Sequence, residues 1–116
     1  MNKEKFNFVV PAKGENLSMV RLTTSAIASK SNFSIDKIED LKLCISEICN
    51  IIIKGEASDV FNIEYFLGDD EIEVSLLDLS KPKKEMGDIE MSQMIIKALI
   101  EDITFSQESI KIRLTV

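Results

Sequence analysis

Glu47 is the residue whose type and position most clearly suggest chemistry, because it lies in the middle of a segment rich in isoleucine and leucine. Its neighbours at helical spacing are Cys44, Asn50, Ile51 and Lys54. A carboxylate at such a place is solvated, paired with Lys54 or with a residue from another element, or directed into a pocket. Since glutamate is rarely buried without a partner, the residues alone favour a solvated or paired Glu47 over one that lines a pocket.

The cysteines and the missing histidines exclude several kinds of site. The chain has no His, and its two cysteines are Cys44 and Cys49. A zinc site built from Cys and His is therefore excluded, as are nucleophilic triads and general-base chemistry that depend on His. The cysteines lie five residues apart, on different faces of a helix, so they cannot form a disulfide within it. We expect two buried thiols and no metal site built by them.

The composition describes an acidic chain with enough apolar residues for one core. Its 116 residues fit a single domain, 1–116, and 45% of them are apolar. The 20 acidic residues outnumber the 14 basic ones, which gives a formal charge of −6 and disfavours a nucleic-acid partner. No apolar run reaches the length of a membrane span, and the N-terminal residues lack the apolar region of a signal peptide. The sequence predicts a cytoplasmic protein that binds neither nucleic acid nor membrane.

Residues 36–55 form the longest segment with helical periodicity, and the rest of the chain is arranged around it. Asp36 is expected as the N-cap, Glu39 as the acid of a capping box and Gly55 as the C′ residue. Apolar residues recur at spacings of three and four, which is the pattern of one buried helical face. They are Ile38, Leu41, Ile45, Ile48 and Ile52. Elsewhere, strands are expected at 5–10, 60–67, 71–78 and 110–116, and helices at 15–31 and 91–103.

This order of elements, β-α-α-β-β-α-β, predicts the α/β (α+β) class and a two-layer sandwich. One mixed or antiparallel sheet would carry three helices on a single face. The other face of the sheet should meet water, because opposite charges are mixed across it. Its residues are Lys5, Asn62, Glu64, Glu71, Glu73, Lys111 and Arg113. Residues 79–89, which include Pro82 and Gly87, are expected to form a mobile loop.

Four strings of sequence carry a resemblance to a known family. They are FVVPAKGENLSMVRLTTSAIASK, FSIDKIEDLKLCISEICNIII, EVSLLDLS and IIKALIEDITF, in this order. They resemble the small bacterial anti-sigma-factor serine kinases of the general-stress and sporulation switches, within the superfamily of histidine-kinase-like ATPases. The resemblance covers most of the chain and is most specific in the first two strings.

The resemblance implies a fold, a cofactor and partners. It implies a two-layer domain of the histidine-kinase-like ATPase fold that binds ATP and Mg²⁺ and forms a homodimer. Such a domain holds a sigma factor inactive. It also binds a small anti-anti-sigma protein, which it phosphorylates on serine.

The second helix of this family carries a glutamate beside the attacking water or hydroxyl and, four residues later, an asparagine that binds Mg²⁺. Glu47 matches the glutamate and is the expected catalytic residue if the chain is active. Ile51 stands at the asparagine position. Asn50 is one residue early, about 100° round the helix, so we expect it to be a poor substitute as a nucleotide-site ligand.

Two further family motifs match this chain only in part. Asp78 matches an aspartate that contacts the adenine amino group, but Ser80 and Pro82 stand where glycines are expected. Glu90 and Ser92 stand at a glycine pair that surrounds the phosphates. Side chains at these positions obstruct close approach of the backbone, and Glu90 would also repel a phosphate.

Arg21 is the residue that the resemblance assigns to partner binding. It lies in the string VRLTTS and matches a family arginine that contacts both the sigma factor and the anti-anti-sigma protein. Without the resemblance, an ordinary surface arginine on a helix would be the favoured interpretation.

Three functions remain as hypotheses. The favoured one is an anti-sigma-like regulatory protein that acts by binding its partner, without a nucleotide cofactor, because several requirements of a phosphate site fail together. The second is an ATP- and Mg²⁺-dependent serine/threonine protein kinase that uses Glu47 as base, Asp78 for adenine and Asn50 for the metal. The third is a small scaffold that pairs through a sheet edge or its first helix and has no sigma-factor partner.

Overall fold

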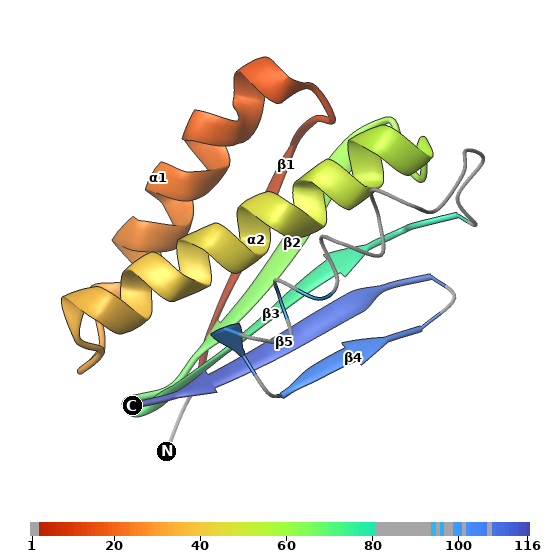
Figure 1. The fold of residues 1–116 in the computed structure, drawn as a ribbon. Helices are drawn as coiled ribbons and strands as arrows, with labels where there is room; N and C mark the ends of the chain where they lie inside the picture. The colour runs from red at the N-terminus through yellow and green to blue at the C-terminus, as the bar shows by residue number, and fades with distance from the viewer. Residues whose placement is uncertain (1–2, 81–93, 95, 97–98, 101, 107) are drawn as a thin grey trace.

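The computed structural model describes residues 3–80, 94, 96, 99–100, 102–106 and 108–116. Strands β1, β2, β3, β5 and β4 form one sheet in that order, and every neighbouring pair is antiparallel. Helices α1 and α2 lie side by side on one face of this sheet (Figure 1). The elements are β1 (Glu4–Pro11), a 3-10 turn (Gly14–Asn16), α1 (Leu17–Ala28), α2 (Ile35–Gly55), β2 (Val60–Leu67), β3 (Glu71–Leu77), β4 (Ile103–Phe105) and β5 (Ile110–Thr115).

This arrangement confirms the two-layer α+β sandwich and corrects two details of it. The sheet is antiparallel throughout its described strands, so the mixed alternative is wrong. The described residues contain two complete α-helices rather than three. Of the helix predicted at 91–103, Met94, Ile96 and Leu99 are helical, while most of the segment lies outside the described residues.

The C-terminal end of that predicted helix is wrong. Ile103 belongs to β4, where it pairs with Ile112 of β5. The sequence Ile-Thr-Phe consists of two β-branched residues and one aromatic residue, types that suit a pleated strand better than the last turn of a helix. None of the described helices is long and apolar enough to cross a membrane.

Helix α2 begins and ends differently from the prediction. Ser34, not Asp36, is the N-cap, and its hydroxyl accepts a hydrogen bond of 3.2 Å from the Lys37 N–H. Serine and aspartate are both good caps, and the helix starts at the earlier one. Gly55 is the last helical residue, and Glu56 follows it in the left-handed conformation with φ of 53°. The C-cap therefore carries a side chain where glycine was expected.

The core lies between the apolar stripe of α2 and the covered face of the sheet. Leu41, Ile45, Ile48 and Ile52 of the predicted stripe are fully buried. Each such side chain contributes about 1.5–3 kcal/mol by its removal from water. The predicted buried thiols are confirmed, since Cys44 and Cys49 are free and buried. Residues of the sheet complete this core: Phe61, Ile63, Tyr65, Ile72, Val74, Leu76 and Ile112.

The uncovered face of the sheet carries ion pairs, as its mixture of charges predicts. Lys5 of β1 lies 3.3 Å from Glu64 of β2, and Arg113 of β5 lies 2.9 Å from Glu71 of β3. In each pair the two residues lie diagonally opposite each other on neighbouring strands. These ion pairs join β1 to β2 and β3 to β5 on the face opposite the two described helices.

Candidate functional site

Glu47 is half-buried on α2, three residues after Cys44. The Cys44 thiol donates a long hydrogen bond of 4.0 Å to the Ile96 carbonyl oxygen. Burial, followed by the negative charges of Asp40 and Glu47, raises the pKa of the Cys44 thiol to about 12. Asp40, Cys44 and Glu47 follow the i, i+4, i+7 spacing of one helical face. The helix thus presents two carboxylates beside a protonated thiol.

Ile51 occupies the position one turn beyond Glu47 and is 5% exposed. Its hydrocarbon side chain belongs to the hydrophobic core and offers no oxygen to a cation. Mg²⁺ binds almost exclusively through oxygen ligands. Asn50, which does carry an amide oxygen, is half-buried and lies about 100° away around the helix. At the Ile51 position, α2 therefore does not fit the Mg²⁺ of an ATP complex.

Asp78 follows β3 with φ of 57°, in the left-handed region that aspartate adopts more readily than most residues. Its Oδ2 accepts a hydrogen bond of 2.6 Å from Nδ2 of Asn62 on β2. Asn62 lies between the fully buried Phe61 and Ile63, so its side chain points to the uncovered face of the sheet. The Asp78 carboxylate is therefore held on the face away from α1 and α2.

The two residues after Asp78 are fixed by backbone hydrogen bonds. The Leu79 N–H donates to the Glu108 carbonyl at 2.9 Å, and the Ser80 N–H donates to the Ala57 carbonyl at 2.8 Å. The Ser80 hydroxyl also donates to the Ala57 oxygen at 2.9 Å. The first two residues of the predicted 79–89 loop are therefore held by the segment between α2 and β2 and by the segment between β4 and β5. The other positions named for the phosphate motifs, Pro82, Glu90 and Ser92, lie outside the described residues.

Arg21 lies exposed on α1 and reaches across to α2. Its Nη1 donates a hydrogen bond of 3.3 Å to the hydroxyl of Ser46, which is buried. Its positive charge also acts on Cys49, where it opposes the burial that raises the pKa of this thiol to about 12. The structure thus brings Arg21 next to the residue that precedes Glu47 in the chain.

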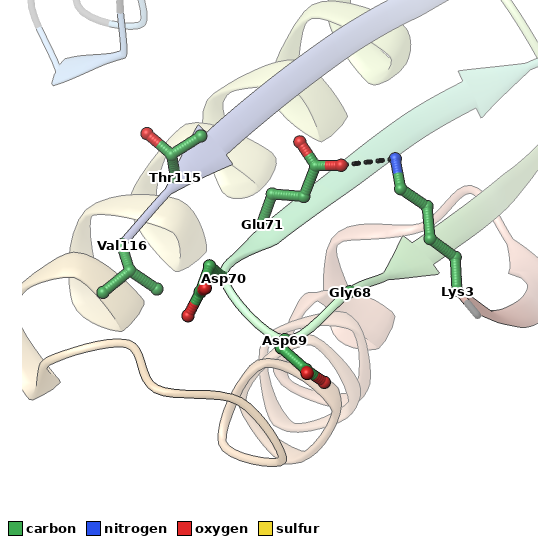
Figure 2. Close-up of a pocket in the computed structure, with 7 residues that line it drawn as sticks. All are labelled: Lys3, Gly68, Asp69, Asp70, Glu71, Thr115 and Val116. Carbon is green, nitrogen blue, oxygen red and sulfur yellow. Dashed lines mark ion pairs between the residues drawn. The ribbon is translucent and has the colours of Figure 1, made fainter. Parts of the chain in front are cut away.

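A hollow of about 380 Å³ lies at the other end of β3 from Asp78. Figure 2 shows Lys3 and Glu71 at this hollow, with the turn Gly68–Asp70 and the C-terminal residues around them. The seven residues of β3 separate it from Asp78 by roughly 20 Å. None of the predicted site residues Arg21, Glu47, Asn50 and Asp78 lines it.

The sequence interpretation missed two residues that contact the predicted ones. Asn62 was predicted only as a solvent-facing residue of its strand, and the pattern of alternation carries no signal for its bond to Asp78. Ser46 was not singled out, although it directly precedes Glu47 in the string SEIC. A buried hydroxyl on a helix requires a partner, and that requirement would have been the one signal for it.

Comparison with known proteins gives the family of this chain. A serine-protein kinase RsbW of Listeria monocytogenes serotype 4a is 37% identical over 100 residues, which cover 78% of this chain and 64% of that protein. The aligned part thus spans just under two thirds of that relative. An RsbW of Listeria monocytogenes serovar 1/2a is 34% identical over 86% of this chain and 78% of its own length. An RsbW of Bacillus cereus is 30% identical over 86% and 76%.

A solved structure supports the fold independently of sequence. The RsbU and RsbW domains of Rv1364c from Mycobacterium tuberculosis match this structure with a TM-score of 0.75 over 97% of this chain and 32% of that chain, at 15% sequence identity. Comparison with family models found no match. The identities to the relatives and their coverage show that the chain belongs to the family of the serine-protein kinase RsbW.

Proposed function

We propose that this chain is an anti-sigma-factor-like regulatory protein that acts by binding a protein partner and has little or no kinase activity. The observation that carries the proposal is the buried Ile51, one helical turn after Glu47. Phosphoryl transfer depends on metal ions that neutralise the developing charge and on groups that position the phosphates. Without a metal ligand at this position, Glu47 has little to act upon.

The position of Asp78 supports the same proposal. Its carboxylate is bonded to Asn62 on the uncovered face of the sheet, while both helices lie on the opposite face. Because its Oδ2 already accepts from the Asn62 amide, we infer that it does not serve the adenine contact that the sequence resemblance assigns to it. No nucleotide cofactor is therefore part of the proposal.

The partner surface in this proposal is the exposed side of α1. Arg21 is exposed on this helix, as are two apolar side chains, Met19 and Leu22, which are 46% and 69% exposed. Arginine and apolar side chains are both frequent in the buried centres of protein interfaces. A sigma factor or an anti-anti-sigma protein is the proposed partner, and a homodimer is the proposed assembly.

The second candidate function is an ATP- and Mg²⁺-dependent serine kinase that phosphorylates an anti-anti-sigma protein. Two observations favour it. Glu47 is retained on α2, and the relatives carry the name serine-protein kinase. In this candidate Asn50 would have to hold the metal in place of Ile51.

Binding and phosphate transfer, measured on the same proteins, separate the two functions. The full chain would be mixed with each purified sigma factor and anti-anti-sigma protein of its source bacterium, with and without Mg·ATP labelled on the γ-phosphate. The proposal predicts that one partner binds equally well in both conditions and that no label is transferred. Label on a serine of the partner would establish the kinase, and the absence of any binding would leave the scaffold hypothesis.

A further inference from the structure

We propose that the free edge of β1 is an interface at which a second copy of this chain adds its own β1, antiparallel, about a two-fold axis at Asn7. The inference rests on the proposed function in one respect, the homodimer, and names the surface that forms it. Within the described residues, β1 is the first strand of the sheet and pairs with β2 alone. The other side of such a strand presents backbone N–H and C=O groups that can pair with another chain.

The backbone hydrogen bonds between β1 and β2 show which residues point to the free edge. The Ala12 N–H donates to the Asp59 carbonyl oxygen at 2.9 Å, and these two residues continue the register of the two strands. In an antiparallel pair, positions bonded in this way alternate with positions that are not. Alternate residues of β1 therefore bond to β2, whereas the N–H and C=O groups of Lys5, Asn7 and Val9 point away from it.

Pro11 closes this edge at one end. It also occupies an outward position, but proline has no N–H to offer a second chain. Its carbonyl oxygen accepts hydrogen bonds of 2.9 Å from the Lys13 N–H and from Nδ2 of Asn16. The open part of the strand is thus the stretch 5–9, and Asn7 is its middle residue. A two-fold axis at Asn7 would pair every outward N–H and C=O of this stretch in both copies.

The side chains suit this register. Lys5 would lie opposite Val9 of the second copy, and Asn7 opposite its own equivalent, so that no like charges meet. All three are exposed on the face away from the helices, Val9 at 52%. On the helix-covered face, Phe6 would lie opposite Phe8 of the second copy. Both are partly buried at the border of the core, and cross-strand aromatic pairs stabilise antiparallel strands.

Other positions of the axis use the edge less well. An axis at Lys5 would set two ammonium groups directly opposite each other, which is destabilising. An axis at Phe8 or at Val9 would set an outward residue opposite Pro11, which has no N–H to donate to it. The axis at Asn7 avoids both costs.

Sedimentation of the full chain over a range of concentrations tests the interface. Val9→Pro removes an outward N–H without removing a bond to β2, and Val9→Ala, which keeps this N–H, is the matched control. We expect the parent and Val9→Ala to form a reversible dimer, and Val9→Pro to raise the dissociation constant at least tenfold. Circular dichroism of each variant checks that it is folded. A parent that stays monomeric to millimolar concentration, or equal dissociation constants for the two variants, would overturn the proposal.

A second variant tests the position of the axis. Asn7→Lys would set two ammonium groups opposite each other, so the dimer should weaken at low salt and recover as salt screens the repulsion. A misfolded chain would not recover in this way. Thr104→Lys adds the same charge on β4, at the opposite edge of the sheet, and should not weaken the dimer. Equal behaviour of the two lysine variants would overturn the axis at Asn7.

The proposed function can fail separately from this interface. Tight binding of Mg·ATP, or the absence of any protein partner, would overturn the proposed function and leave a dimer through β1 in place. A dimer that neither Val9→Pro nor Asn7→Lys weakens would overturn the interface and leave partner binding untouched.

Discussion

The guanidinium of Arg21 donates a hydrogen bond of 3.3 Å to the Ser46 hydroxyl and so joins α1 to α2 one residue before Glu47. This contact holds an exposed cation at a fixed place on the helical layer. The same arginine is the one that the sequence resemblance assigns to partner binding. Arg21 is therefore singled out twice, by its hydrogen bond to Ser46 in the structure and by its match to the partner-binding arginine of the family.

Arg21→Ala should weaken partner binding and leave the fold intact. The side chain is exposed but donates to the buried Ser46 hydroxyl, so we expect the free energy of unfolding to fall by about 1 kcal/mol. Affinity for the partner should fall at least tenfold, as for an arginine at the centre of an interface. Arg21→Lys keeps the charge but not the planar fork of donors and is the matched control. Unchanged affinity of the alanine variant, measured by calorimetry, would contradict the assignment of the partner surface to α1.

A buried hydrogen bond between Tyr65 and Thr24 should make the two positions strongly non-additive. The Thr24 hydroxyl donates to the Val20 carbonyl at 2.8 Å, so the Tyr65 hydroxyl is the donor in their 2.7 Å contact. Thr24→Val leaves this donor buried without an acceptor and should cost about 1–3 kcal/mol in the free energy of unfolding. Tyr65→Phe removes the donor itself and should cost less.

A double-mutant cycle by urea denaturation checks this prediction. The combined variant, Thr24→Val with Tyr65→Phe, should be more stable than Thr24→Val alone, because it contains no unpaired hydroxyl. Simple additivity of the two single changes would show that the hydrogen bond is not formed in solution.

Glu71 should make the stability of the protein depend on acid pH. Its hydrogen bonds to Lys3 and Arg113 hold the pKa of its carboxyl below the ordinary value of 4.5. A carboxyl with a lowered pKa stabilises the fold above its unfolded pKa, and this contribution is lost as the pH falls through the folded pKa. Compared with the parent, Glu71→Gln should be less stable at pH 7 and equally stable at pH 2–3, in urea titrations. A difference that persists at the lower pH would rule out this charge as its source.

Both thiols should be unreactive in the folded protein. The pKa values of Cys44 and Cys49 are each raised to about 12, chiefly by burial, and the thiolate is the reactive form. A raised pKa also means that the stabilising contribution is complete below pH 9 and is lost as the pH rises toward 12. At pH 8, a disulfide reagent should label neither cysteine of the native protein and both in guanidinium chloride. Rapid labelling of the native protein would contradict the buried positions.

Most of the fold follows from patterns that the sequence displays directly. The three-and-four spacing from Ile38 to Ile52 identified α2, and the alternation in residues 60–67 and 71–77 identified β2 and β3. Strand β4 was missed, because three residues are too few for alternation to be distinguished from the end of a helical pattern. Whether Ser34 or Asp36 becomes the N-cap depends on the path of the residues that precede α2, and the local sequence does not determine that path.

The sequence alone could predict which residues belong to the candidate site, but not how their side chains are oriented. The position of Glu47 and the absence of a ligand at residue 51 can both be read from α2 alone. The orientation of Asp78 depends on one backbone angle and on Asn62, which lies 16 residues earlier in the chain. The contact of Arg21 with Ser46 spans 25 residues. Neither contact has a periodic signal, because each depends on how the elements pack.

Titration of the full chain with Mg·ATP and Mg·ADP by calorimetry, together with thermal denaturation at saturating nucleotide, tests the central claim most directly. A ligand that binds only the native state must raise the melting temperature. If the chain acts by protein binding alone, millimolar nucleotide should produce neither binding heat nor a shift in melting temperature. Micromolar binding with a raised melting temperature would contradict the account and would return Glu47 and Asp78 to a phosphoryl-transfer site.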